Sequence, residues 1–187
     1  LTYGKAPGLR MPVQNGTPST NKVPATYQAR RYMTGGGYYL TNISGIGESE
    51  HFFWGRTYPS KYPTWTTTFT LTVPATSPVT LRVSLYGGNQ WSDINPDHHV
   101  AVKLNGTSIG DIYFDGINWY TGELVIPAGR IASSPTINTL VFTGPLDLGK
   151  SSDLVFIDSI ELLYTDNFTA QNNNLAFTYA QNGTWKY

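Results

Sequence analysis

The sequence predicts an all-β protein, an antiparallel β-sandwich or jelly roll. Short runs in which apolar and polar residues alternate recur at regular spacing along the chain, and no stretch has the pattern of an amphipathic helix. One pair of these runs flanks Asn105-Gly106, and an Asn-Gly pair between alternating runs is the strongest local signal for a β-hairpin. With 187 residues the chain is long enough for one well-buried domain.

The N-terminal region, residues 1–34, has a different character. Pro7, Pro12, Pro18 and Pro24 recur along it, and such spacing interrupts helices and central strands. We therefore predict an extended arm or linker over 1–34, a hinge at the three glycines that follow, and the sandwich over 35–164. Residues 165–187 form either a returning strand or the start of a following domain.

Nine strands are expected in the sandwich. Thr66 to Thr72 show the pattern well, because every second residue is Thr while Phe69 and Leu71 take the alternate positions. Pro74 ends that strand, and Val79, Leu81, Val83 and Leu85 then give the inward face of the next. The expected strands cover 38–43, 51–54, 65–73, 79–86, 99–104, 108–114, 119–126, 136–143 and 154–164.

Composition excludes several classes of function. The net charge is zero and 13% of residues are charged, so the chain lacks the Lys/Arg excess that nucleic-acid binding needs. No apolar run approaches the ~20 residues of a membrane span. There is no Cys, which excludes disulfides, thiolate zinc sites and a cysteine nucleophile. The 13 Tyr and 5 Trp are typical of secreted β-proteins and of surfaces that stack on sugars.

Several phrases of the sequence resemble a known family. FTLTVPATSPVTLRVSLYGG, VAVKLNGTSIGDIYFDG and VFIDSIELLY are similar to the paired strands, the Asn-Gly hairpin and the last strand of galactose-binding-like jelly rolls in carbohydrate-binding families 6 and 35. ESEHFFW and PDHHV resemble phrases of accessory β-domains in large secreted bacterial proteins that also carry gingipain-like peptidase domains. The resemblance covers residues 38–164.

This resemblance implies a galactose-binding-like fold and a non-catalytic role. It implies a glycan ligand, neighbouring domains in a longer chain, and a secreted or cell-surface location. Such modules often hold a structural calcium ion between an acidic residue near the first strand and an Asp of the last. Here Glu48 or Glu50 would pair with Asp158, which interrupts an apolar strand. The alternative for Asp158 is that it faces solvent by simple alternation.

The densest group of candidate ligand-binding residues lies between Trp91 and Tyr120. Sugars are bound by flat aromatic faces together with Asn and Asp side chains, which hydrogen-bond the hydroxyl groups. The alternative is that these aromatic residues fill the core, as we expect for Trp54 and Trp65. The candidate ligand-binding residues are Trp91, Asp93, Asp97, His98, Asp115, Asn118, Trp119 and Tyr120.

Other chemistry is less well supported by the pattern. The loop from Asp93 to Asp97 offers oxygen atoms at every second residue, but His98 replaces the Gly of an EF-hand and no Glu follows at its twelfth position. His98 and His99 are adjacent on a strand, so their rings point to opposite faces, and a zinc site would also need His51. An enzyme with a new site around Asp97 and His98 stays an alternative, as does a purely structural domain that docks a neighbouring peptidase.

Overall fold

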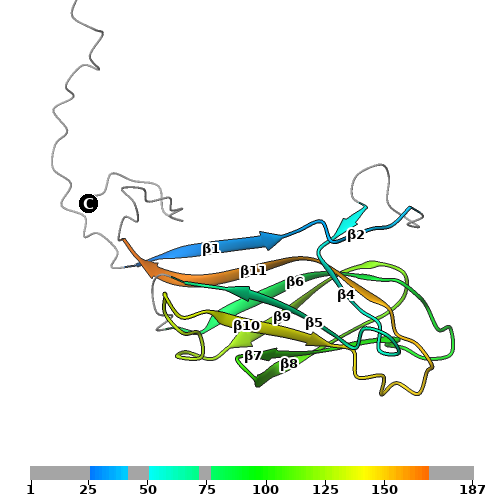
Figure 1. Cartoon of the computed structure of the whole chain (residues 1–187). Helices are drawn as coiled ribbons and strands as arrows, with labels where there is room; N and C mark the ends of the chain where they lie inside the picture. Colours follow the sequence, from blue (N-terminus) through cyan, green and yellow to red (C-terminus); the bar gives the residue numbers. More distant parts are fainter. Residues whose placement is uncertain (1–25, 42–50, 72–76, 169–187) are drawn as a thin grey trace, which may run out of the picture.

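The computed structural model describes residues 26–41, 51–71 and 77–168, which form an all-β sandwich without α-helix in these ranges (Figure 1). All strand pairs in its sheets are antiparallel. The strands are β1 (Thr26–Thr34), β2 (Tyr38–Tyr39), β3 (Phe52–Phe53), β4 (Gly55–Thr57), β5 (Thr64–Phe69), β6 (Val79–Gly87), β7 (His98–Leu104), β8 (Thr107–Phe114), β9 (Trp119–Ile126), β10 (Asn138–Thr143) and β11 (Val155–Asn167).

Two sheets form the layers of the sandwich. One sheet has the strand order β1-β11-β6-β9, with β4 also paired to β11, and the other has the order β5-β10-β7-β8. In Figure 1 the first sheet lies above the second, and the short β2 strand lies beyond the end of β1. The β2–β3 pair forms a small separate ribbon. The five-stranded sheet therefore has one face toward the core and an outer face that the second sheet does not cover.

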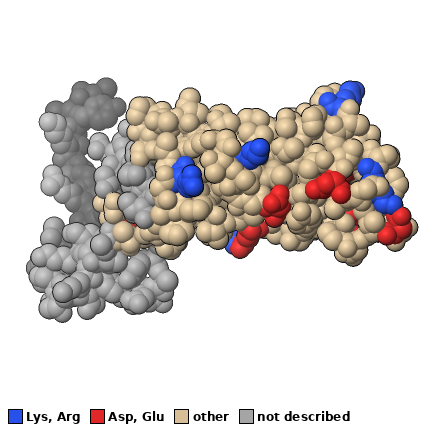
Figure 2. All heavy atoms as spheres, turned by 90° about the horizontal axis from the view of Figure 1, so that it is seen from below, with Lys and Arg blue, Asp and Glu red and all other residues tan. Residues whose placement is uncertain are grey.

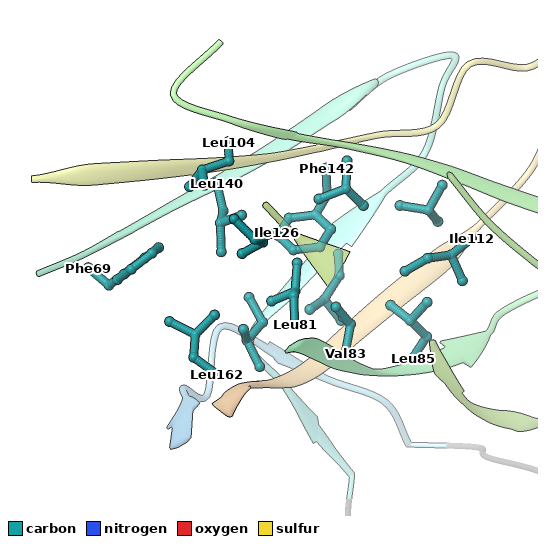
Figure 3. Packing of buried hydrophobic residues seen from close by; sticks show 14 of the residues in the cluster. Phe69, Leu81, Val83, Leu85, Leu104, Ile112, Ile126, Leu140, Phe142 and Leu162 are labelled. Carbon is teal, nitrogen blue, oxygen red and sulfur yellow. The ribbon is translucent and has the colours of Figure 1, made fainter. Parts of the chain in front are cut away.

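The core lies between the sheets, where every second residue of the facing strands points inward (Figure 3). Leu81, Val83 and Leu85 of β6 are fully buried, as the alternation predicts. Burial of one such side chain contributes about 1.5–3 kcal/mol. Trp54 and Trp65 pack against this cluster in an edge-to-face pair, with ring centroids 5.0 Å apart.

The predicted hairpin is confirmed. Strands β7 and β8 pair along their length, and the turn between them is Asn105-Gly106. Both turn residues have positive φ, 49° and 81°, which is the conformation that a type I′ turn requires and that Asn and Gly tolerate best.

One boundary differs from the prediction. Residues 26–34, which we assigned to the arm, form β1 and pair with β11 from Thr26↔Asn167 to Thr34↔Ser159. After Pro24 no proline interrupts the chain, and Tyr27 and Ala29 alternate into the sandwich. The predicted boundary lies at residue 35 because the prolines at positions 7–24 indicate an arm, although none of them lies within 26–34.

Strand β4 is covered by none of the expected strands, and the remaining strands agree with the sequence to within a few residues. The two short strands expected at 38–43 and 51–54 are reduced to β2 and β3, and β11 continues to Asn167. The rest of the predicted arm and the segment 169–187 lie outside the described residues.

Candidate functional site

A row of hydroxyl side chains crosses the outer face of the five-stranded sheet. Thr34 on β1 pairs with Ser159 on β11, Ser159 pairs with Ser84 on β6, and Ser84 pairs with Thr121 on β9. Because neighbouring strands lie about 4.8 Å apart, the row spans about 14 Å. Four small side chains in line leave a shallow trough, which we call the hydroxyl trough.

A β-bulge in β11 creates this row. Ile157 pairs with Leu85 and Ser159 pairs with the next residue of β6, Ser84, so that Asp158 is the extra residue. Ile157 and Ile160 both face the core, while Ser159 faces outward between them. Such an insertion redirects the side chains that follow it. The Asp158 carboxylate accepts a hydrogen bond from Ser159 Oγ at 2.8 Å.

Charged residues form one wall of the trough. The neighbouring row of the sheet runs Tyr32, Glu161, Arg82 and Glu123. Arg82 Nη1 lies 2.9 Å from Glu161 Oε2 and its Nη2 lies 2.7 Å from Glu123 Oε1, and Arg30 pairs with the other Glu161 oxygen. Two guanidinium groups and two carboxylates balance in charge. The wall therefore offers fixed hydrogen-bond groups without favouring an ion of either sign.

Aromatic residues form the opposite wall. Tyr86 pairs with Phe156 on one side and with Trp119 on the other. Phe53 of the β2–β3 ribbon covers them, with its ring 5.4 Å from that of Trp119 in a stacked arrangement. Next to this cluster Phe52 stands 54% exposed at the surface.

Two hollows lie along this face and share Tyr32. One of 340 Å³ is lined by Tyr32, Thr34, Gly35, Gly36, Phe52 and Asp158. The other, of 230 Å³, is lined by Arg30, Tyr32, Arg82, Ser84, Thr121, Ser159 and Glu161. The Tyr32 side chain is 54% exposed between them. The outer face thus combines exposed aromatic surface, hydroxyl groups and a charge-balanced network in adjoining hollows.

Two predicted ligand residues, Trp91 and Asp93, lie at the loop end of the sandwich and hold that loop in place. Trp91 Nε1 donates to Ser152 O at 2.9 Å, and Lys150 Nζ lies 5.2 Å from its ring centroid. Asp93 is exposed and forms an ion pair with Lys150, whose hydrogen bond lowers the pKa of the Asp93 carboxyl.

Asp97 and His98 are also predicted ligand residues, and both are buried, with exposures of 1% and 0%. Asp97 accepts hydrogen bonds from the backbone N–H groups of Trp91 and Gly116, at 2.7 and 2.8 Å. His98 Nδ1 lies 2.6 Å from Asp153 Oδ1, and its ring stacks on Phe114. A glycan at the surface does not reach these two side chains. They tie the loops together instead.

The electrostatics of this buried cluster favour the protonated imidazole. Burial by itself lowers the pKa of His98, but the hydrogen bond and charge of Asp153, together with the charge of Asp97, outweigh burial and raise it above the usual value. The Asp153 carboxylate also accepts a hydrogen bond from the backbone N–H of His99 at 3.0 Å.

The two adjacent histidines point to opposite faces, as predicted. The His99 ring stacks on Tyr113 with centroids 4.1 Å apart, its Nδ1 lies 2.8 Å from Asp147, and its Nε2 lies 3.0 Å from Asp111. The three histidines do not meet at one point, because His51 lies against the backbone of Leu40. In the described ranges no group of three or more His, Asp or Glu residues could hold a metal ion.

The remaining predicted residues near β9 do not form one platform. Asp115, Asn118, Trp119 and Tyr120 are all exposed. Trp119 faces the outer side of its sheet, whereas Tyr120 points the other way and stacks on Phe114 with ring planes 9° apart. Of the eight predicted ligand residues, only Trp119 therefore belongs to the aromatic wall beside the hydroxyl trough.

The predicted calcium ligands can be followed only in part. Asp158 lines the larger hollow, half-buried, while Glu48 and Glu50 lie outside the described residues. Calcium takes six to eight oxygen ligands, and among the described residues that line this hollow Asp158 supplies one carboxylate. These residues do not make a calcium site by themselves, so the calcium ion stays a prediction.

Two further observations concern membrane spans and surface charge. Within the described residues no helix is long and apolar enough to cross a membrane. Figure 2 views the molecule from the side of β7 and β8, and the Lys and Arg side chains there are scattered rather than gathered in a basic patch.

Comparison with solved structures identifies the fold. A dimeric latent PorU from Porphyromonas gingivalis is similar over 83% of this chain, with a TM-score of 0.56 and 15% identity. The match takes up 14% of the PorU chain, so this chain spans about one seventh of that protein. At this identity the likeness concerns the fold alone.

Some carbohydrate-binding modules give weaker structural matches, with TM-scores below 0.5. A family 35 module from an environmental isolate is similar over 78% of this chain and 98% of its own, with a TM-score of 0.45 and 14% identity. A CBM36 module in complex with calcium and xylotriose is similar over 72% of this chain and 98% of its own, with a TM-score of 0.40 and 15% identity. No family model and no curated protein matches the sequence. The strand order is that of an antiparallel jelly-roll sandwich, and the likeness to PorU agrees with this fold.

Proposed function

We propose that this chain is a non-catalytic glycan-binding module and that the glycan lies in the hydroxyl trough. The observation that carries the proposal is the pair of adjoining hollows on either side of Tyr32, on the outer face of the five-stranded sheet. This replaces the loop around Trp91 and Asp93 as the favoured position, because the polar groups of that loop are engaged in holding the loop itself.

The chemistry of the trough suits a sugar chain. Exposed rings at Tyr32 and Phe52 provide flat apolar surface for the C–H face of a pyranose ring. The hydroxyl row offers both donors and acceptors, and the Arg82 network fixes further ones in position. The balance of charge in that network favours a neutral polyhydroxylated ligand over an ion. A trough of about 14 Å accommodates several sugar units rather than one.

The wider setting follows the resemblance given above. We infer that the module belongs to a secreted or cell-surface protein with further domains. The alternative is a structural or interaction domain beside a peptidase, without sugar binding. A calcium ion held by Asp158 together with Glu48 or Glu50 is part of the proposal, and thermal melts with calcium and with EDTA test it.

A glycan array followed by calorimetry tests the proposal. We expect the protein to bind an oligosaccharide, and Tyr32→Ala and Phe52→Ala each to weaken binding about tenfold, which corresponds to roughly 1.4 kcal/mol. Tyr113→Ala is the matched control, since this exposed ring lies on β8 of the other sheet. Equal losses from Tyr113→Ala and Tyr32→Ala would refute the trough, and no binding to any glycan would favour the interaction domain.

A further inference from the structure

Arg56 of β4 is a cation without an acidic partner. Its Cζ lies 4.5 Å from the ring centroid of Tyr38 and 4.6 Å from that of Tyr62. Its Nε is buried and has no hydrogen-bond acceptor. Within the described ranges no ion pair involves this residue. The rings hold the guanidinium in place but leave its buried Nε without an acceptor.

This situation is unusual among the half-buried cations of the described residues. Arg30 and Arg82 pair with carboxylates, Lys150 pairs with Asp93, and Arg31 donates to Thr70 O at 2.7 Å. A half-buried guanidinium with unmet donors is costly, because water no longer hydrates it fully and no protein acceptor replaces that water. Arg56 therefore has hydrogen-bonding capacity that the described part of the fold does not use.

A second cation lies on the same ring. Lys61 Nζ is 5.3 Å from the centroid of Tyr62, and Lys61 also has no ion pair among the described residues. The turn that carries Lys61 and Tyr62 is closed by two reciprocal backbone hydrogen bonds between Tyr58 and Tyr62, at 2.6 and 2.8 Å. Two positive charges thus lie within 5.3 Å of the centroid of one tyrosine ring, and no carboxylate of the described residues pairs with either of them.

Three separate elements fix this arrangement. Arg56 is held by the pairing of β4 with Phe156 of β11, Tyr38 belongs to β2, and Tyr62 belongs to the turn after β4. A site that is ordered before its ligand arrives loses little conformational entropy on binding. Guanidinium groups bind oxyanions through two parallel hydrogen bonds, and an ammonium group adds a point charge.

We propose that Arg56, Lys61 and the two tyrosines form a binding site for an oxyanion, a carboxylate or a sulfate or phosphate group. The ligand is either a free ion or the charged group of an acidic sugar. The site lies at β4 and its turn and adjoins the aromatic wall, because Arg56 pairs with Phe156, so it adds anion recognition to a face that otherwise suits neutral ligands. It does not depend on the glycan-binding function.

The test observes the Arg56 side chain directly. The Nε–Hε resonances of the arginine side chains are recorded by NMR on labelled protein, and the Arg56 signal is identified by its loss in Arg56→Lys. Sodium sulfate, sodium glucuronate and glucose are titrated in turn, with sodium chloride at matched ionic strength as the reference. We expect a saturable shift of the Arg56 signal with sulfate, with glucuronate or with both, and none with glucose or chloride.

Variants then assign the binding to this site. Lys61→Gln should weaken the anion affinity severalfold, and Arg56→Lys, monitored through the amide signals of the turn, should weaken it about tenfold because it loses the paired donors. Lys103→Gln removes the same charge from the exposed face of β7 in the other sheet and should leave the affinity unchanged.

The outcomes separate the possible ligands and the two proposals. A response to glucuronate alone indicates a carboxylate ligand, and a response to sulfate alone indicates a sulfate or phosphate group. No saturable shift with either anion, or equal shifts with chloride, overturns the site. Loss of neutral-glycan binding in Tyr32→Ala concerns the trough only, so either proposal can fail without the other.

Discussion

The loop end of the sandwich and the outer face of the five-stranded sheet contain the same residue types in different roles. At the loop end, Asp97, His98 and Asp153 are buried, and their polar atoms bind ring nitrogens and backbone N–H groups. On the outer face, Glu161 and Arg82 are also paired, but they border a trough that stays open to solvent. An Asp or His in a sequence therefore indicates a ligand site only when its position in the layers is known.

The difference has a physical cause. A loop at the end of a sandwich has many backbone N–H groups without strand partners, and buried carboxylates satisfy them. A sheet satisfies its own backbone, so the side chains on its outer face need no such role. Hydroxyl and charged groups there remain available to a ligand.

The largest effect is expected from the loop end. Asp153→Ala removes the acceptor of both His98 Nδ1 and the His99 N–H, and the loss of one partner of a buried charged pair costs about 3–5 kcal/mol. Urea unfolding measures the change in the free energy of unfolding. Asp93→Asn is the control, because that carboxylate is exposed, and it should change stability little. Equal stability of the two variants would contradict the structural role of the buried cluster.

The second prediction concerns the outer face. Ser84→Gln places a longer side chain in the floor of the trough and should lower glycan affinity about tenfold, or roughly 1.4 kcal/mol, with the fold intact. Thr66→Gln makes a comparable change on the exposed side of β5 in the other sheet and should leave binding unchanged. Unchanged affinity in Ser84→Gln would place the ligand elsewhere. Calorimetry and circular dichroism provide the two measurements.

A third prediction uses pH to distinguish the regions. The pKa of His98 is raised in the folded protein, so its contribution to stability is complete below the unfolded value of about 6.5 and is lost as pH rises through the folded pKa. Unfolding free energies measured from pH 6 to pH 9 should therefore fall with pH. This slope should diminish in Asp153→Asn, which lacks the carboxylate. A slope that persists unchanged in the variant would assign the pH dependence to another group.

The smallest effect is expected at the edge of the charged wall. Glu123→Gln breaks an ion pair with Arg82 in which both side chains are about half exposed, and such pairs contribute about 0.2–1 kcal/mol. Arg82 keeps its contact with Glu161, so the wall should persist. Thermal unfolding of the variant checks this. A loss as large as that in Asp153→Ala would mean that the outer face is as tightly coupled as the loop end.

Much of the fold could be predicted from the sequence because its signals are local. Alternation gives β6 and β9, and Asn105-Gly106 gives the β7–β8 hairpin with its positive φ angles. Strand β1 is not predicted, because the prolines before it indicate an arm. Its nine residues pair with β11, which is distant in the sequence, so the pairing leaves no local signal. The split of His98 and His99 between faces follows from strand geometry alone.

The candidate site was harder to predict. Thr34, Ser84, Thr121 and Ser159 are separate polar residues in the sequence, and the strand order β1-β11-β6-β9 alone brings them into one row. The only indication of this row in the sequence is that Ser84 and Arg82 take the outward positions of the alternating strand β6. The residues between Trp91 and Asp97 predict a site because they are close together in the sequence. Tyr32 belongs to the predicted arm and is therefore not among the candidates.

The bulge at Asp158 has a consequence for how this protein can change. Asp158 is the residue of β11 that has no counterpart on β6, so its deletion would leave Ile157 paired with Leu85 and Ser159 paired with Ser84. Ile160 and Leu162 would still face the core. A substitution at Asp158 can alter the hollow that it lines without changing the alternation of the strand. Deletion of Asp158 should therefore remove the bulge and keep both faces of β11, while other insertions and deletions should be tolerated best in the loops between strands. The alternation of side chains along this one strand determines which residues pack in the core and which lie on the surface where a ligand can bind.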